Sequence, residues 1–420
     1  MRIMDGQEHQ PLEDKDIQCL GHLRKVFDLL DELEPIGCAR DRAGNRELHF
    51  NTYCKLVLLY IWNPLIDSIR TLQDTVGLET VAKATGIKKF SLGSFSESVR
   101  VFQPEALKPI MKELAGKLTK PAIEPRLDSV EHAITLVDGT VLSGLTRLVR
   151  SACGTDGRYN TARDGRAVYG WRLHTQLDLE SFSVHRIDRT GAGNGGKNRE
   201  SRVLAGSLEP ERCYVADGGY ADQKLFDEVI DAGSSFVFRI REDSVLKNVL
   251  EERELSQAAL DAQIVRDAIV QLPAATHPVR IVMVQVAPHP RRVRSGVIQS
   301  ERVLLATSLL DLPPELVALI YLYRYTVELF FRILKQLLGM RHLLSQREEG
   351  IDIQVYCTVI VCLLICLITG KQPNKSNRNM IGWYLIGLAS REELLRHLNR
   401  PDNTGVKKRA KDELWKKLGY

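Results

Sequence analysis

The spacing of apolar residues from 52 to 118 is helical throughout. Within this segment, residues 78–86 form an amphipathic pattern that ends at a glycine, which is typical of a helix and its C-terminal cap. Residues 94–102 begin with Ser94, have Glu97 three positions later in the pattern of a capping box, and stop before Pro104. The pattern predicts two short helices joined by a tight connection.

Two helices of this kind are typical of a helix-turn-helix unit, with Lys88 and Lys89 in the connection available to a phosphate backbone. A small helical bundle that makes no DNA contact explains the same pattern equally well. Both interpretations assign residues 1–125 to an N-terminal helical domain, and the first makes it a DNA-binding domain.

From residue 126 onward the period of the apolar residues changes to that of strands. The predicted order is three strands, a helix, a strand, a helix and a strand, at residues 133–140, 170–180, 181–190, 200–208, 212–219, 222–233 and 235–242. A glycine-rich stretch at 191–198 is interpreted as a flexible turn. This order predicts an α/β core whose sheet mixes antiparallel and parallel pairing.

The next segment interrupts this core. Residues 243–312 contain a charged helical pattern and then apolar strands at 279–287 and 302–310, which indicates a β-rich insertion. Pro313 and Pro314 fit the first turn of the helix that follows. We therefore predict the first part of the core at 126–242, the insertion at 243–312, the second part of the core at 313–375 and a basic helical tail at 376–420.

Composition changes this picture little. The formal net charge of +5 over 420 residues is a mild basic bias that suits a polyanionic partner without requiring one. The eight cysteines include no Cys-x-x-Cys pair, so we expect reduced thiols and a cytoplasmic location. The most apolar stretch, residues 355–369, is shorter than the roughly 20 residues that span a bilayer, and we interpret it as a buried helix rather than a membrane anchor.

Candidate chemistry is concentrated in residues 321–335, a segment that is apolar apart from a few residues at odd intervals. On a helix, these residues fall within an arc of about 80°: Tyr321, Arg324, Glu328, Arg332 and Lys335. Apolar side chains cover the other sides. We therefore expect a mostly buried helix whose charged edge faces a groove.

Two predicted strands each lead into an Asp-Gly pair, at Asp138 and at Asp217. Taken alone, such a pair is more often only a turn. Together with Glu328, however, the two aspartates would bring three carboxylates to one edge of a mixed sheet. Three carboxylates can hold two Mg²⁺ ions, and two metal ions about 4 Å apart clamp the attacking and leaving oxygens of a displacement at phosphorus.

The other polar residues of the helix suit the same hypothesis. Arg324, Arg332 and Lys335 lie within one or two turns of Glu328 and would contact backbone phosphates. Tyr321 would donate its hydroxyl or stack on a base. The sequence thus predicts a site for metal-dependent phosphoryl transfer on a nucleic acid.

The spacing Tyr321-x2-Arg324-x3-Glu328-x6-Lys335 resembles the Y-(2)-R-(3)-E-(6)-K signature of the insertion sequence four family of bacterial DDE transposases. Residues 134–140 and 216–220 resemble that family's first and second Asp motifs, and the resemblance covers roughly residues 94–368. It implies a ribonuclease-H-like α/β fold with flanking helices. It also implies that Asp138, Asp217 and Glu328 are the catalytic triad and the ligands of two Mg²⁺ ions, for which Mn²⁺ can substitute.

The resemblance implies a DNA transposase that binds double-stranded terminal inverted repeats, cleaves them and joins the ends to target DNA. Such an enzyme would act as a homodimer in the synaptic complex and would associate with the nucleoid in the cytoplasm of a bacterium. Two alternatives stay open: a ribonuclease-H-like nuclease without strand transfer, and a domesticated DNA-binding protein. The presence of all three acidic residues counts against the second alternative.

The chain departs from the family pattern at two places. Gly218 stands where many relatives have Arg, which removes one possible phosphate contact. The segment 239–320 contains no Phe, Tyr or Trp, whereas some relatives use a Trp in the insertion to stack a base flipped from a DNA hairpin. Excision through a hairpin would therefore need another platform, such as Tyr321.

Overall fold

The computed structural model describes residues 20–44, 46–63, 65–118, 124–143, 160–161, 167–168, 170–180, 183–191, 199–241, 248–286, 301–337, 343–345, 347–369, 375–385 and 388–400. The glycine-rich turn predicted at 191–198 lies almost wholly outside these residues, and so do residues 386–387 and 401–420 of the basic tail predicted at 376–420.

The centre of the molecule is a nine-stranded sheet with the strand order β5-β4-β1-β6-β7-β11-β10-β9-β8. Its strands are β1 (Ala133–Ser143), β4 (Gly170–Asp178), β5 (Ser183–Gly191), β6 (Arg212–Ala216), β7 (Ser235–Ile240), β8 (Val249–Glu252), β9 (Ile264–Val270), β10 (Val279–Val286) and β11 (Glu301–Thr307). Two short strands, β2 (Asn160–Thr161) and β3 (Ala167–Val168), pair separately.

The first five strands of this order form the core. Strands β1, β4 and β5 pair antiparallel in sequence, whereas β6 and β7 continue parallel to β1 on its other side. The two parallel connections run through α9 (Glu200–Ala205) and α10 (Gln223–Asp231). The predicted fold class, a ribonuclease-H-like mixed sheet with flanking helices, is confirmed.

The insertion extends the same sheet. Strand β11 pairs antiparallel with β7, and β10, β9 and β8 follow outward. The charged helical stretch predicted before these strands is wrong for residues 248–270, which form β8, the short helix α11 (Gln257–Asp261) and β9. Residues 264–270 alternate buried and exposed side chains imperfectly, and they become a strand because β10 supplies hydrogen-bonding partners along one side.

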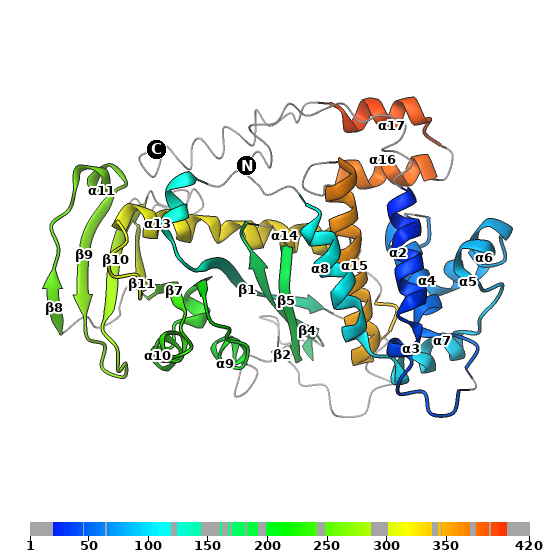
Figure 1. Cartoon of the computed structure of the whole chain (residues 1–420), viewed down its shortest axis with the longest axis horizontal. Coiled ribbons are helices and arrows are strands. Elements are labelled where there is room, and N and C mark those ends of the chain that lie inside the picture. Colours follow the sequence, from blue (N-terminus) through cyan, green and yellow to red (C-terminus); the bar gives the residue numbers. More distant parts are fainter. Residues whose placement is uncertain are drawn as a thin grey trace.

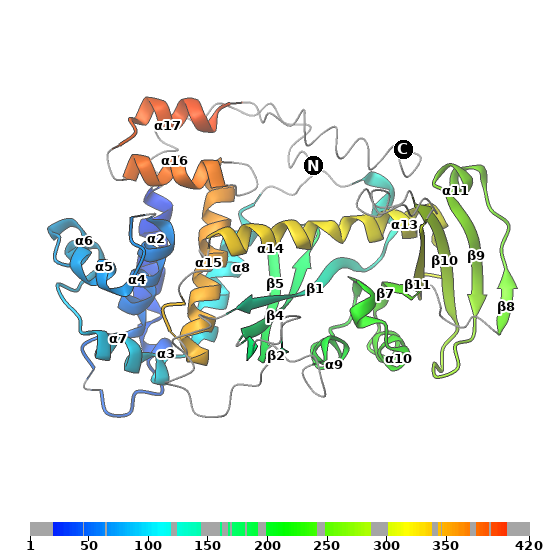
Figure 2. The ribbon, with the colours of Figure 1, turned by 180° about the vertical axis from the view of Figure 1, so that it is seen from behind.

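Helices cover both faces of the sheet. Figures 1 and 2 show α13 (Pro314–Tyr323) and α14 (Tyr325–Leu337) along one face, here called the front face, and α9 and α10 on the opposite, back face. Pro313 and Pro314 stand at the start of α13, as predicted. The two faces bury separate apolar clusters, one with Leu136 and Val215 and the other with Val137 and Tyr214, because successive strand residues point to opposite sides.

The N-terminal helices pack at one end of the molecule, against α15 (Glu348–Thr369). They are α2 (Leu20–Glu32), α3 (Glu34–Gly37), α4 (Phe50–Trp62), α5 (Ile69–Thr75), α6 (Glu79–Thr85), α7 (Leu92–Ser98) and α8 (Lys108–Gly116). The C-terminal helices α16 (Lys375–Leu385) and α17 (Arg391–Leu398) complete this end. The helical nature of residues 52–118 is confirmed.

The two helices of the predicted DNA-binding unit are α6 and α7. Gly86 ends α6 in the left-handed conformation, as its position predicted. The capping box at Ser94 and Glu97 is wrong, because α7 begins three residues earlier and Ser91 accepts the hydrogen bond from Ser94 N at 2.8 Å. Ser91 can act as the cap because its backbone is extended, whereas Ser94 is already helical.

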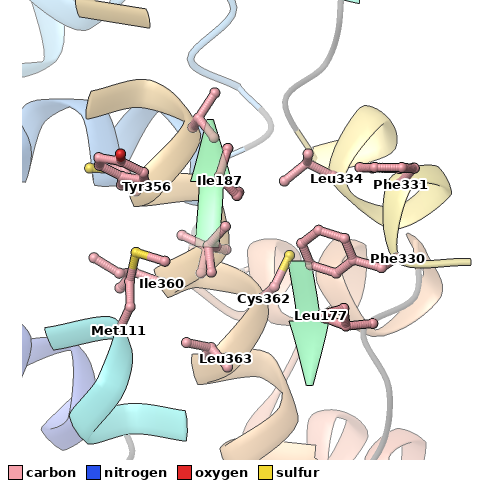
Figure 3. Packing of buried hydrophobic residues seen from close by; sticks show 14 of the residues in the cluster. Met111, Leu177, Ile187, Phe330, Phe331, Leu334, Tyr356, Ile360, Cys362 and Leu363 are labelled. Atoms are coloured by element: carbon pink, nitrogen blue, oxygen red, sulfur yellow. The ribbon is translucent and has the colours of Figure 1, made fainter. Parts of the chain in front are cut away.

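Among the described residues, α15 alone has the length and apolar composition of a membrane-crossing helix. Most of it is buried inside the protein, between the N-terminal helices and the sheet, so it is a core helix as the sequence predicted. Figure 3 shows Phe330 of α14 between Leu177 of β4 and Cys362 of α15. This packing fixes α14 against the sheet and thereby positions its charged edge.

Candidate active site

The register of the parallel strands brings Asp138 and Asp217 together. Leu136 of β1 lies opposite Val215 of β6, so the residues two positions later, Asp138 and Asp217, occupy equivalent places on neighbouring strands. Alternation directs both carboxylates to the front face, where Leu136 and Val215 also point. Two residues far apart in sequence thus form one acidic pair under α13 and α14.

The two Asp-Gly pairs differ in backbone structure. Residue 217 follows the end of β6, and its carboxylate accepts a hydrogen bond from Gly218 N at 2.7 Å at the start of a 3-10 turn. Strand β1, in contrast, continues past Asp138 to Ser143 because β4 pairs with it over that whole length. The prediction that Asp138 lies at the exit of its strand is therefore wrong; Asp138 lies within β1, at the level where its other neighbour, β6, ends.

The predicted helix 321–335 is interrupted once. Helix α13 ends at Tyr323 and α14 begins at Tyr325, with Arg324 between them in helical conformation. The backbone N–H of Arg324 donates to Tyr321 O, one residue closer than in a regular α-helix. Tyr321, Arg324 and Glu328 still face the two aspartates, so the predicted edge survives this local tightening.

Arg324 connects the carboxylates. Its guanidinium donates to Glu328 Oε1 at 2.6 Å and to Asp138 Oδ2 at 3.5 Å, and its side chain is only 15% exposed. The Tyr321 hydroxyl donates to Asp217 Oδ1 at 3.3 Å, and the Arg324 guanidinium lies over the Tyr321 ring. The three predicted acidic residues are therefore joined through one arginine and one tyrosine.

Burial and charge shift the pKa values in this cluster. The pKa of Asp138 is raised to about 6, mainly by burial; the Gly139 N–H and Arg324 act to lower it, and Glu328 and Asp217 act to raise it. Burial also raises the pKa of Tyr321 to about 12, and the Asp217 carboxylate adds to that shift. At neutral pH the Tyr321 hydroxyl is therefore protonated and donates a hydrogen bond, and the Asp138 carboxylate is ionised at a cost in folding free energy.

The cluster suits a hard divalent cation by its donor chemistry. Carboxylate oxygens from Asp138, Asp217 and Glu328 are the ligands that Mg²⁺ and Mn²⁺ prefer. No three acidic, His or Cys side chains among the described residues are close enough together to hold an ion in the present arrangement. The Arg324 guanidinium lies between two of the carboxylates, so ion binding requires that it move away.

The structure does not bring the remaining two predicted residues into the cluster. Arg332 is exposed, and its guanidinium donates to the Tyr325 hydroxyl at 3.3 Å. Lys335 is partly buried one turn further along α14. Contact with DNA phosphates stays a prediction for both side chains.

Sequence reasoning missed two charged residues beside the cluster. Arg239 of β7 lies 4.0 Å from Asp217 Oδ1. It places a guanidinium near the position that Gly218 leaves without one. Glu200 of α9 lies directly behind the aspartates and is considered below. Neither residue belongs to a recognisable motif, and only the pairing of strands far apart in sequence brings them here.

The raised pKa of Asp138 predicts a stability effect. At pH above about 6 the Asp138 carboxylate is ionised in both the folded and the unfolded protein, and ionising it in the folded protein lowers the free energy of unfolding. Below its ordinary pKa of 3.8 the carboxyl group is protonated in both states, so this effect is absent. Asp138→Asn should therefore stabilise the protein at pH 7.5 by about 1–3 kcal/mol. That gain should disappear as the pH falls to 4.

Urea denaturation without divalent metal, at several pH values, measures this difference. Asp217→Asn serves as the comparison, because Asp217 has a more exposed side chain. A gain for Asp138→Asn that does not change with pH would contradict the electrostatic explanation.

The chain is similar in sequence to known proteins. Residues 130–364 match the family model of the transposase DDE domain. The protein named "Putative transposase y4zB" from Sinorhizobium fredii (strain NBRC 101917 / NGR234) is 26% identical over 206 residues, which are 49% of this chain and 55% of that protein. The chain thus spans about half the length of this curated relative.

A crystal structure of an endonuclease V from Bacillus subtilis is also similar, at 13% sequence identity and a TM-score of 0.22, over 56% of this chain and 95% of that one. The family match alone covers more than half of the chain and includes both strand aspartates and the glutamate of α14. The chain belongs to the transposase DDE domain family.

Proposed function

We propose that the protein is a DNA transposase of the insertion sequence four type, which cleaves the terminal inverted repeats of its element and joins the 3′ ends to target DNA. The observation that carries this proposal is the meeting of Asp138, Asp217 and Glu328 around Arg324 and Tyr321, within a transposase DDE domain. Two acidic residues that share one buried arginine, with a third bonded to the neighbouring tyrosine, are not an arrangement that stability alone favours, because buried charges cost free energy.

The side chains of the cluster suggest a division of labour. Asp138, Asp217 and Glu328 would hold two Mg²⁺ ions. When bound, such ions activate a water molecule as the nucleophile at neutral pH and stabilise the negative charge on the phosphoryl group in the transition state. Arg324 would contact a backbone phosphate after leaving the carboxylates, and Tyr321 would orient Asp217 or stack on a base. Arg239 adds a second positive charge where DNA would approach Asp217.

The test is an assay with supercoiled plasmid that carries the element's own inverted repeats, purified protein and Mg²⁺. Nicks and double-strand breaks at the repeat ends are expected, followed by strand transfer when pre-cut ends are supplied. Cleavage without joining would identify a nuclease, and end binding without cleavage would identify a domesticated DNA-binding protein. Sedimentation of the protein with paired ends measures whether the active complex is a dimer.

Arg324→Gln should separate the two roles proposed for Arg324. Because its guanidinium lies between Asp138 and Glu328, removing that charge should raise Mn²⁺ affinity in the absence of DNA by about tenfold. The same variant should bind cut ends more weakly, with a salt dependence shallower by about 0.9 for each lost phosphate contact.

Calorimetric titration with Mn²⁺ and DNA binding at several salt concentrations measure both effects. Arg266→Gln is the matched control for metal binding, because Arg266 is an arginine paired with a glutamate far along the sheet, on β9. Weaker Mn²⁺ binding by Arg324→Gln would refute the idea that the guanidinium competes with metal.

A further inference from the structure

A buried ion pair lies behind the two aspartates. Glu200, at the start of α9, is 8% exposed and accepts a hydrogen bond from Arg172 of β4. Alternation along β1 directs Gly139 to the back face, opposite to Asp138, and α9 packs on that face. The pair therefore contacts the strands that carry the aspartates from the side away from Arg324.

Glu200 touches the backbone next to both aspartates. A Cβ atom added at Gly139 would come closer than 3.0 Å to Glu200 Oε1, and one added at Gly219 would come closer than 3.0 Å to Glu200 Oε2. Each carboxylate oxygen thus lies against one glycine, and each glycine is within two residues of an aspartate. One side chain spans the gap between the β1 strand and the turn after β6.

The carboxylate of Glu200 has little freedom to move. Arg172 holds it, and Arg172 also lies 3.6 Å from the place of a Cβ at Gly139. Burial raises the pKa of Tyr220 well above its ordinary value, and Glu200 and Asp138 both raise it further. Glu200 on the back face and Asp138 on the front face therefore both act on the buried Tyr220 side chain, so only the sheet itself separates the two carboxylates.

We infer that Glu200, held by Arg172, is a positioning residue that fixes the spacing between the Asp138 and Asp217 carboxylates from behind the sheet. The inference rests on the catalytic role proposed above for those aspartates. A buried charge suits this task because its bond to Arg172 is directional, whereas an apolar side chain would allow the strand and the turn to slide. It also explains why residue 219 is a glycine.

A rescue experiment tests the positioning role of Glu200 most directly. Gly219→Ala should lower plasmid cleavage by about a hundredfold and weaken Mn²⁺ binding, because the new methyl group displaces Glu200 or the turn. Gly219→Ala combined with Glu200→Asp, which shortens the acidic side chain, should recover at least about tenfold of that loss. Gly206→Ala at the end of α9 is the matched control, since its Cβ would meet only Arg202 O and Val203 O, at 3.6 and 3.7 Å; cleavage should stay close to that of the wild type.

Glu200→Gln tests the charge itself. The substitution keeps the size of the side chain and should reduce both Mn²⁺ affinity and cleavage by about tenfold or more. Circular dichroism checks that the variant is folded. Wild-type Mn²⁺ affinity and cleavage in this variant would overturn the inference. A double variant no better than Gly219→Ala alone would overturn it too, whether measured as activity or, if Gly219→Ala does not fold, as recovery of folded protein.

Asp138→Asn, assayed in parallel, separates this inference from the proposed function. If Asp138→Asn cleaves as the wild type does, the catalytic assignment fails whatever the Glu200 variants do. If Asp138→Asn is inactive and the Glu200 and Gly219 variants behave as the wild type, only the positioning role fails.

Discussion

Glu328→Gln is expected to abolish DNA cleavage while leaving the fold and the binding of inverted repeats intact. The amide is isosteric and can still accept the hydrogen bond from Arg324, which now measures 2.6 Å. It loses the negative charge that a divalent cation requires, and the loss of several kcal/mol of transition-state stabilisation corresponds to roughly a thousandfold or more in rate. Asp138→Asn and Asp217→Asn should behave alike.

Plasmid nicking with Mg²⁺ and gel-shift binding of the repeats measure the two halves of this prediction. Glu228→Gln on α10 is the control, because Glu228 pairs with Arg202 on the back of the sheet, away from the cluster. Turnover within tenfold of the wild type for any of the three variants would remove that residue from the proposed triad.

Arg280→Met should produce the largest loss of stability in the insertion. The side chains of Arg280 and Asp267 are 2% and 3% exposed, and two hydrogen bonds of 2.8 and 2.7 Å join them. Arg280 Nη1 also donates to three backbone carbonyls, those of Leu309, Leu310 and Leu312, just before α13. Removing the arginine leaves a buried carboxylate and three carbonyls without this partner, at a cost of about 3–5 kcal/mol.

Thermal and urea unfolding measure this cost. Arg266→Met on the neighbouring strand is the control, because its pair with Glu252 is more exposed and should contribute less than about 1 kcal/mol. Arg280→Met with Asp267→Leu should regain part of the loss, since the double change removes the unpaired carboxylate but does not restore the hydrogen bonds that Arg280 donated to the backbone carbonyls. An Arg280→Met variant as stable as Arg266→Met would show that the hydrogen bonds of Arg280 do not hold the insertion to the segment before α13.

Some features of the fold and the site follow from neighbouring residues, whereas others depend on contacts between residues far apart along the chain. The placement of Tyr321, Arg324 and Glu328 on one edge followed from helical spacing alone, and the structure keeps it although the helix tightens at Arg324. The strands that carry Asp138 and Asp217 were equally predictable from their apolar patterns. The errors at Ser94 and at residues 248–270 arose where one cap or one strand partner decides between two locally acceptable structures. The domain boundaries and the DNA contacts of Arg332 and Lys335 stay predictions.

By itself, the sequence determined which residue types occur at which helical and strand positions, because hydrophobic period and side-chain spacing are properties of neighbouring residues. It thereby fixed the mixed fold class and the three acidic candidates. Only the tertiary structure decided that Asp138 lies level with Asp217, that Arg324 stands between Asp138 and Glu328, and that Glu200 lies behind both aspartates. Those contacts depend on the register of β1 against β6 and on the packing of α9 and α14 against opposite faces of the sheet. They join residues far apart along the chain, and no local pattern encodes such a register.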